Sequence, residues 1–496
     1  MKKPSATTLN IGISVFYQLF TTLCRLLLAR IILKSFGSEN NGLMQSIDQI
    51  LTYTMLLEGG VGGIMRASLY KPLAEGNMNA VSDVFYDGKR FAGKLSSIFI
   101  IFAVALALSM KFFVQTEFDW LYVATMVIII SANTLFNYYF AFIHRILMIA
   151  DQKLYMLQIF QIISTVASLA VCLVAIYFGA NLHVVKTLTI IVSLIVPVCC
   201  RMYVRKHYAI SVNAPDKKTS VAQKRDAVIH HLSYVIHKNT DVVMLSLFGG
   251  FKDVSIYTVY HSVIVMLEQV IVSISSGISS KIGELWARRE DKKLNDTINM
   301  YEVVSGALSC AVATVCILLI LPFVMLYTDG VNDANYHQPL FALFAIGASL
   351  ADLLSLPYKT LISAAGHYKQ TKIGAIGEVS INLGLSLILI HSLGLVGVAI
   401  GTLAAMTFRL LYSVWYLSKD ILNRPKRRFF KFVLPNLGLV ALLVAVFWKF
   451  GDFYADSILQ LFVNAIKVSV LVFPLFAVMN LLIYPKLFKM IVKKKE

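Results

Sequence analysis

The sequence predicts an all-α, polytopic membrane protein with about 14 transmembrane helices. Of its 496 residues, 58% are hydrophobic and only 15% are charged, whereas a soluble domain carries about 25% charged residues. The apolar residues form runs of about 18 or more, long enough to cross a hydrocarbon core as helices. The basic residues also gather on one side of the resulting topology, as in multi-pass membrane proteins.

The apolar runs and the polar segments between them set the order of the predicted spans. We place the spans near residues 9–33, 43–65, 92–110, 120–142, 155–178, 184–200, 228–248, 254–278, 303–327, 338–357, 371–391, 394–417, 431–450 and 458–484. The long polar loops all fall on one side. One of them, 279–302, has the pattern of an amphipathic helix along the membrane surface, with Ile282, Leu285, Trp286 and Leu294 towards lipid.

The positions of the basic residues predict the orientation. Most of the 45 Lys and Arg residues fall on the side of the N-terminus. The other side receives five: Lys34, Lys111, Lys186, Lys252 and Lys449. This bias places both termini in the cytoplasm and the chain in the cell inner (cytoplasmic) membrane. The net charge of +18 therefore indicates contact with anionic membrane lipids and no nucleic-acid partner.

The chain repeats itself, which predicts two lobes. The stretch "RILMIADQKLYMLQ" at 145 corresponds to "KTLISAAGHYKQTK" at 359, and "KSFGSEN" at 34 corresponds to "SLFGGFK" at 246. We predict an N-lobe of six spans at 1–206, a cytoplasmic linker at 207–227, a C-lobe of six spans at 228–420, and two extra spans with a basic tail at 421–496. An even number of spans per lobe predicts pseudo-twofold symmetry about the membrane normal, with a substrate path between the lobes.

Ionisable residues inside spans are costly and mark substrate or ion pathways. Arg25, Lys238 and Arg409 lie deep in their spans. We expect them to help line a cationic cavity that binds an anionic head group such as a pyrophosphate. His261 and Glu268, in the eighth span, are also intramembrane and receive no role from the sequence.

A second group of polar residues suits a small cation. Asp241, Glu378 and Asn382 would provide the carboxylate and amide oxygens that hold Na⁺ or exchange H⁺. Asp241 also has a simpler interpretation, in which it neutralises Lys238 or His237. The sequence predicts no other cofactor, no metal site with a recognisable ligand spacing, and no catalytic residues.

The stretch "LLEGGVGGIMRASLYKPLAEGN" at 56–77 places a glutamate before four glycines near the inner end of the second span. Glycines let helices approach closely or bend. We expect Glu58, Gly59, Gly62 and Arg66 to form a gate at the cytoplasmic mouth.

The same stretch resembles the polysaccharide flippases of the multidrug/oligosaccharidyl-lipid/polysaccharide exporter superfamily. Those proteins have a glutamate and a glycine near the end of span two, followed by a "sLYkPLaegd"-like element. Here the element reads "SLYKPLAEGN" at 68–77, with Asn77 in place of the usual acidic residue and Gly60 where leucine often precedes glycine. "RIILKSFGSENNGL" at 30–43 and "SIYTVYHSV" at 255–263 are similar to further segments of the family.

The resemblance implies a flippase that moves an undecaprenyl-pyrophosphate-linked oligosaccharide from the inner to the outer leaflet by alternating access, for capsule or exopolysaccharide biosynthesis. It implies a polysaccharide polymerase as a downstream partner. The sequence lacks a G-x-x-x-x-G-K-[ST] loop, so we expect no ATP-driven step. The alternatives are a multidrug or small-cation exporter of the same fold and a peptidoglycan lipid-precursor flippase. A polysaccharide polymerase enzyme is disfavoured, because the outer loops are short and carry no catalytic constellation.

Overall fold

The structure is a computed structural model that describes residues 6–54, 61–113, 118–210, 239–450 and 455–485. Every regular element in these ranges is a helix, which confirms the all-α prediction. Ten helical segments of the described chain are long and apolar enough to cross a membrane. The chain is therefore a multi-pass membrane protein.

The other predicted spans fall in helices that bend or are short. α1 (Ala6–Thr52) contains the first predicted span and the start of the second, with a non-helical residue, Gly37, at φ 83° between them. α14 (Tyr368–Tyr416) contains both the eleventh and the twelfth, and reverses at Gly394, whose φ is 54°. The seventh span is described from Asn239 to Phe248.

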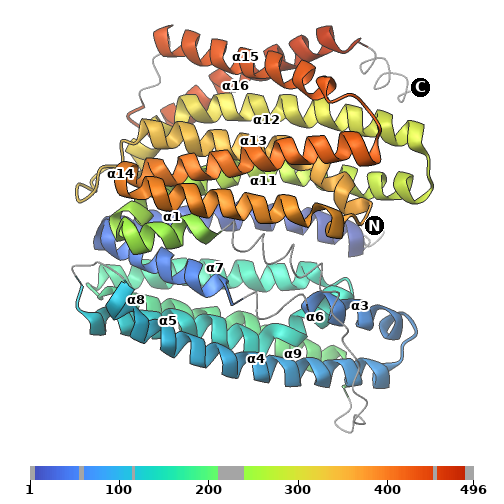
Figure 1. The fold of residues 1–496 in the computed structure, drawn as a ribbon. Coiled ribbons are helices and arrows are strands. Elements are labelled where there is room, and N and C mark those ends of the chain that lie inside the picture. The colour runs from blue at the N-terminus through green and yellow to red at the C-terminus, as the bar shows by residue number, and fades with distance from the viewer. Residues whose placement is uncertain (1–5, 55–60, 114–117, 211–238, 451–454, 486–496) are drawn as a thin grey trace. The chain divides into compact units, whose positions relative to one another are not determined.

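Contacts within the chain define two units. The first comprises Met1–Val235 and Gly250–Ser255. After α1 it contains α3 (Val61–Ala74), α4 (Met78–Phe113), α5 (Trp120–Phe136), the π-helix η1 (Asn137–Ala141), α6 (Phe142–Ala150), α7 (Leu154–Tyr177), α8 (Leu182–Ser193) and α9 (Ile195–His207). Figure 1 shows α4 and α5 running along one another. Ile47, Phe99 and Val127 are buried in one of its two apolar cores.

The second unit comprises Ile236–Gly249 and Ile256–Glu496. It contains most of α11 (Phe251–Ala287), then α12 (Asp291–Tyr327), α13 (Pro339–Ala364), α14, the π-helix η2 (Leu417–Ile421), α15 (Arg427–Phe450) and α16 (Ile458–Ile483). In Figure 1 the helices α12 to α14 lie side by side. Large aromatic side chains fill its interior, with Tyr260, Tyr301 and Phe341 all less than 2% exposed.

The backbone repeats in step with the sequence. Left-handed residues recur after 213 to 215 positions, as the pairs Gly37 and Gly250, Gly76 and Arg289, Gln152 and Gly366, and Gly179 and Gly394. Such residues end a helix and turn the chain. The two halves therefore turn at matching places, which supports the internal duplication. Of the predicted linker 207–227, only residues 207–210 are described. The lobe boundaries therefore stay a prediction.

The prediction of a surface helix at 279–302 is wrong. α11 continues to Ala287 and α12 begins at Asp291, with a turn at Arg289 between them. Ile282, Leu285 and Leu294 are 0%, 3% and 1% exposed. The apolar stripe is buried by packing within the protein, and amphipathic periodicity by itself does not distinguish such packing from contact with lipid.

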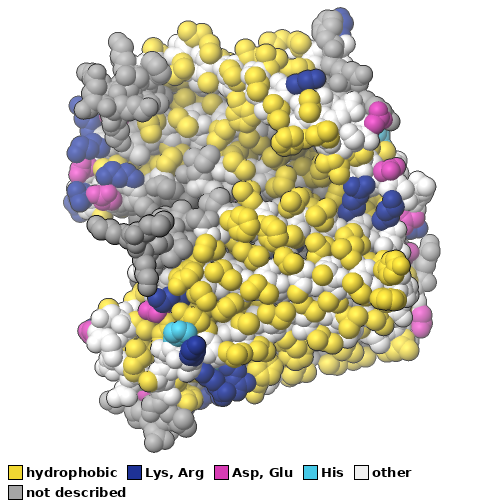
Figure 2. Space-filling view, turned by 180° about the vertical axis from the view of Figure 1, so that it is seen from behind, with side chains coloured by type: hydrophobic (Ala, Val, Ile, Leu, Met, Phe, Trp, Pro, Cys, Tyr) yellow, Lys and Arg dark blue, Asp and Glu magenta, His cyan; other side chains and the backbone are white. Residues whose placement is uncertain are grey.

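The outer faces of the helices are apolar, as a membrane requires. Ile101, Ile388 and Leu482 are 70%, 70% and 77% exposed. Figure 2 shows hydrophobic side chains over most of the visible face, with Lys and Arg mainly towards its sides. In water such a surface would aggregate, whereas lipid tails solvate it.

Candidate functional site

The second unit contains a buried polar cluster centred on Asp241, which is 5% exposed. Two helices, α11 and α14, supply its hydrogen-bond partners. The Tyr257 hydroxyl of α11 donates to Oδ2 at 3.1 Å, and the Thr402 hydroxyl of α14 lies 2.8 Å from the same oxygen. The Asn382 amide of α14 donates to Oδ1 at 3.3 Å and to the Thr402 oxygen at 2.9 Å.

The hairpin of α14 brings Asn382 and Thr402 together. Its two arms touch because glycines leave room on the second arm. A Cβ on Gly401 would lie 2.3 Å from the Ser386 hydroxyl oxygen and 2.9 Å from the Ser386 backbone nitrogen. A Cβ on Gly397 would lie 2.5 Å from the Leu389 carbonyl oxygen. The small residues of this arm thus set the spacing on which the cluster depends.

The cluster is rich in oxygen acceptors. The Thr402 hydroxyl has one proton, yet it lies near both Asp241 and the Val398 carbonyl oxygen, 3.1 Å away. Asn382 is 1% exposed, and its Oδ1 has no hydrogen-bond partner among the described residues. An amide oxygen buried without a partner costs free energy unless a cation, proton donor or water meets it. Carboxylate, amide, hydroxyl and carbonyl oxygens are the ligands that hard cations prefer.

A small cavity of about 60 Å³ adjoins the cluster. Its polar lining includes Asp241, His261, Glu268, Asp352 and Thr402. A water molecule needs about 10–15 Å³ of such space, so the cavity has room for a few water molecules or an ion. His261 and Glu268, to which the sequence assigns no role, thus both lie on this cavity.

Glu378 and Arg409 form a pair of their own. Glu378 Oε2 lies 3.4 Å from Arg409 Nε, and the two side chains are only 12% and 11% exposed. Nε and Nη1 of Arg409 have no hydrogen-bond partner in the described part of the chain. The sequence predicts Glu378 for ion coupling and Arg409 for substrate binding, yet the two meet across the α14 hairpin. The other two residues predicted for ion coupling, Asp241 and Asn382, are hydrogen-bonded to each other.

The remaining predicted site residues lie in the first unit or outside the described residues. Arg25 is exposed on α1. In α3, Gly62 is buried, and the buried Nε of Arg66 has no hydrogen-bond partner within the described ranges. Glu58, Gly59 and Lys238 lie outside the described residues. The gate and the substrate-binding role of these residues stay predictions.

Sequence reasoning missed two members of the Asp241 cluster and one buried ion pair. Thr402 is uncharged and lies in a run of small residues, and Tyr257 reads as an ordinary aromatic residue. Tyr257 has a positional signal, since Asp253 and His261 lie one helical turn away, whereas Thr402 has only apolar residues at that spacing. Arg424 reads as a loop cation, yet it forms an ion pair with Glu302 of α12, which is 6% exposed, and donates to Asn299 at 2.9 Å.

No protein-family model and no curated protein sequence matches the chain. Solved structures do. The lipid II flippase MurJ, in an inward closed conformation, aligns with a TM-score of 0.69 at 16% identity, over 96% of this chain and all of that one. An inward-facing multidrug resistance MATE family transporter of the MOP superfamily aligns with a TM-score of 0.60 at 14% identity, over 85% of this chain and 95% of that one. A Vibrio cholerae MATE transporter gives 0.57 at 13% identity, over 84% and 99%.

The chain therefore has the fold shared by MurJ and the MATE transporters of the MOP superfamily. These neighbours are transporters and flippases. At these identities the likeness concerns the fold, so the substrate has to be argued from the site.

Proposed function

We propose that the protein is a flippase that moves an undecaprenyl-pyrophosphate-linked oligosaccharide repeat unit from the inner to the outer leaflet for surface polysaccharide synthesis. The observation that carries this is the alignment with a lipid flippase along 96% of the chain. Such an alignment necessarily includes most of residues 421–496, whereas the two MATE alignments leave about 15% of the chain uncovered. The resemblance of "SLYKPLAEGN" to polysaccharide flippases adds the glycan.

The cations predicted inside the spans fit an anionic substrate, although one of them is neutralised by a carboxylate. Arg409 shares its charge with Glu378. Arg25, also predicted to bind the substrate, is exposed on α1. A cation exposed on a helix within a span attracts a pyrophosphate more strongly than a cationic drug, so the exporter is the weaker candidate.

A peptidoglycan lipid-precursor flippase is the second candidate, since MurJ is named for that lipid. Both candidates use a lipid-linked sugar, and they differ in the sugar. Deletion of the gene followed by analysis of lipid-linked intermediates separates them. We expect one undecaprenyl-linked oligosaccharide to accumulate on the inner leaflet of the cell inner membrane. Accumulation of the peptidoglycan precursor would support the second candidate, and unchanged pools with altered drug sensitivity would support the exporter.

We also propose that the Asp241 cluster couples transport to a cation gradient. The support is geometric: the buried Asp241 carboxylate accepts from Asn382 and Thr402, the Asn382 Oδ1 has no hydrogen-bond partner among the described residues, and Asp241 and Thr402 line a small cavity. Transport by purified protein in vesicles should depend on a Na⁺ or a pH gradient, and Asp241→Asn should remove that dependence. A rate that responds to neither gradient in the wild type would overturn the coupling.

A further inference from the structure

The end of α14 presents a stripe that is apolar at one end and basic at the other. Leu411, Trp415 and Lys419 follow one another at intervals of four residues, so they share one helix face. All three are exposed, Leu411 by 43% and Trp415 by 39%. The distribution of Lys and Arg predicts that this end of α14 lies at the cytoplasmic membrane surface, where tryptophan and lysine are characteristic.

Two ammonium groups gather around the Trp415 indole. The Lys419 Nζ lies 5.3 Å from the ring centroid, and the Lys426 Nζ lies 5.6 Å from it. The two cations are thus at most about 11 Å apart. Neither forms an ion pair with a described residue. The neighbouring carboxylate in sequence is Asp420, and its single negative charge is smaller than the two positive charges of the lysines. Two ammonium groups around one ring, with no ion-pair partner among the described residues, favour an anion beside them.

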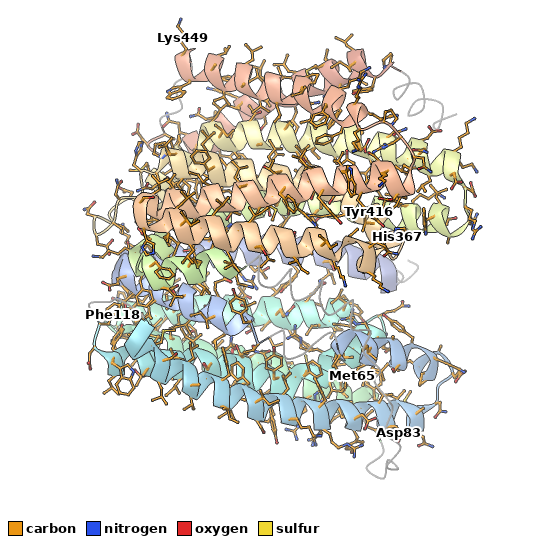
Figure 3. The ribbon with its side chains drawn as sticks, in the orientation of Figure 1. Met65, Asp83, Phe118, His367, Tyr416 and Lys449 are labelled. Atoms are coloured by element: carbon orange, nitrogen blue, oxygen red, sulfur yellow. The ribbon has the colours of Figure 1, made fainter. Side chains whose placement is uncertain are left out.

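The segment that carries Lys426 is held by buried contacts. Between the two lysines, Arg424 forms its ion pair with Glu302, and its backbone N–H donates to the Ser418 carbonyl at 2.9 Å. At the adjoining end of α14, the His367 Nδ1 lies 2.9 Å from the Tyr416 hydroxyl, and Figure 3 shows the two side chains next to each other. The surface cations therefore project from a fixed frame, which lowers the entropy cost of binding a ligand.

Apolar side chains continue from the cations on the next helix. At the start of α15, Arg427 and Lys431 are exposed, followed by Phe430 and Leu434, which are 46% and 62% exposed. A ligand bound here meets positive charge at one end and apolar surface at the other. That combination describes a phospholipid with a negative head group.

We propose that Trp415, Lys419 and Lys426 form a binding site for the head group of an anionic glycerophospholipid of the cytoplasmic leaflet. Its phosphodiester contacts the two ammonium groups, and its acyl chains lie along the apolar residues that precede Lys419 on the same face, Leu411 and Trp415. Arg427 and Lys431 supply further positive charge and make phosphatidylglycerol a better ligand than phosphatidylcholine. The inference is independent of which substrate the protein transports.

The test measures, by native mass spectrometry, how strongly the purified full-length protein binds phosphatidylglycerol and phosphatidylcholine with identical acyl chains. The wild type should prefer phosphatidylglycerol. The K419Q/K426Q variant should weaken phosphatidylglycerol binding about 30-fold, because one cation near an anionic lipid surface contributes about fivefold. Trp415→Leu keeps both charges and should weaken it about fivefold through loss of the ring.

The matched control is K89Q/K94Q, which removes the same charge from two exposed positions of α4. It should leave phosphatidylglycerol binding within about twofold of the wild type. Equal loss in both double variants would overturn the site in favour of general surface charge. Thermal unfolding in phosphatidylcholine checks the fold of each variant. If Trp415→Leu does not fold, the result for K419Q/K426Q decides the test.

A competition experiment separates a membrane lipid from a pyrophosphate-bearing ligand. Inorganic pyrophosphate in excess should leave the bound phosphatidylglycerol in place, because it lacks the acyl chains that contact the apolar stripe. Full displacement by pyrophosphate would reassign these cations to a soluble or substrate-borne anion and overturn the lipid assignment.

Discussion

The Thr402 hydroxyl lies 2.8 Å from a carboxylate oxygen of Asp241, although 161 positions separate the two residues. Thr402 reaches Asp241 from the second arm of the α14 hairpin, and Asn382 reaches it from the first. The hairpin therefore acts as a clamp on a carboxylate that belongs to another helix. Any cation held there would touch three segments of the second unit at once.

Replacing the threonine hydroxyl tests the clamp. Thr402→Val keeps the shape and removes one oxygen ligand and one hydrogen bond to a charged group, each bond of this kind contributing about 1.5–3 kcal/mol. We expect the cation concentration for half-maximal transport in vesicles to rise about tenfold or more. Thr402→Ser keeps the hydroxyl and should stay close to the wild type. Unchanged cation dependence in Thr402→Val would exclude this oxygen from the site.

The Glu378–Arg409 pair predicts a large effect of breaking only one partner. Glu378→Gln leaves a guanidinium in a site where its side chain is 11% exposed, and an uncompensated buried charge costs about 3–5 kcal/mol. We expect a clear fall in the thermal unfolding temperature, measured in lipid. The E378Q/R409M variant removes both charges and should recover most of it.

The same double variant separates stability from substrate binding. If Arg409 binds an anionic head group, E378Q/R409M should be stable yet transport poorly. Wild-type transport by the stable double variant would show that the pair is structural, and would remove Arg409 from the predicted substrate site.

Close packing of the hairpin predicts that it tolerates no side chain at Gly401. A methyl group there would lie within 3 Å of the Ser386 backbone nitrogen, and overpacking costs about 1–3 kcal/mol. Gly401→Ala should lower the unfolding temperature and weaken cation dependence, because it separates Asn382 from Thr402. Gly384, on the same hairpin, has open space within 4 Å of the position that a Cβ would take. Gly384→Ala should leave both properties unchanged or raise stability slightly.

Outside the predicted spans, Tyr208 predicts a pH effect in the first unit. Burial raises the pKa of Tyr208, and its 2.6 Å hydrogen bond to Asp151 raises it further. The folded protein thus favours the neutral phenol, so this contribution to stability is full below the unfolded-state pKa of about 10 and is lost as the pH rises above it. Tyr208→Phe should cost about 1 kcal/mol at neutral pH. Unfolding curves from about pH 9 to 11 should fall less steeply for the variant than for the wild type. Parallel curves would contradict this.

Several features of the protein follow from local sequence. Runs of apolar residues predict helices that cross a membrane because no other regular structure satisfies the backbone there without closing a barrel. The repeat at an offset of about 213 appears again in the left-handed turns at Gln152 and Gly366. Asp241 and Asn382 stand out because a polar group in a span is costly wherever it faces, so the sequence predicts them as members of one site, and the two are hydrogen-bonded.

Other features depend on which helix faces which. Glu378 lies one turn from Asn382, yet its partner is Arg409 on the opposite arm of the hairpin. Arg424 looks like a solvent-exposed loop cation, and only the packing of α12 against the loop before α15 makes it a buried partner of Glu302. The sequence gives no sign that Thr402 belongs to the site. A threonine hydroxyl costs little free energy inside a helix, because it can donate a hydrogen bond to a backbone carbonyl of the same helix.

The sequence by itself determined the all-α membrane class, the internal duplication and the identity of the costly charges, because each of these depends on composition and spacing along one helix. Only the tertiary structure decided which charges neutralise each other and which oxygens surround Asp241. The physical reason is that a hydrogen bond or ion pair depends on distances of about 3–4 Å between side chains, and those distances are set by the hairpin at Gly394 and by the close approach at Gly397 and Gly401.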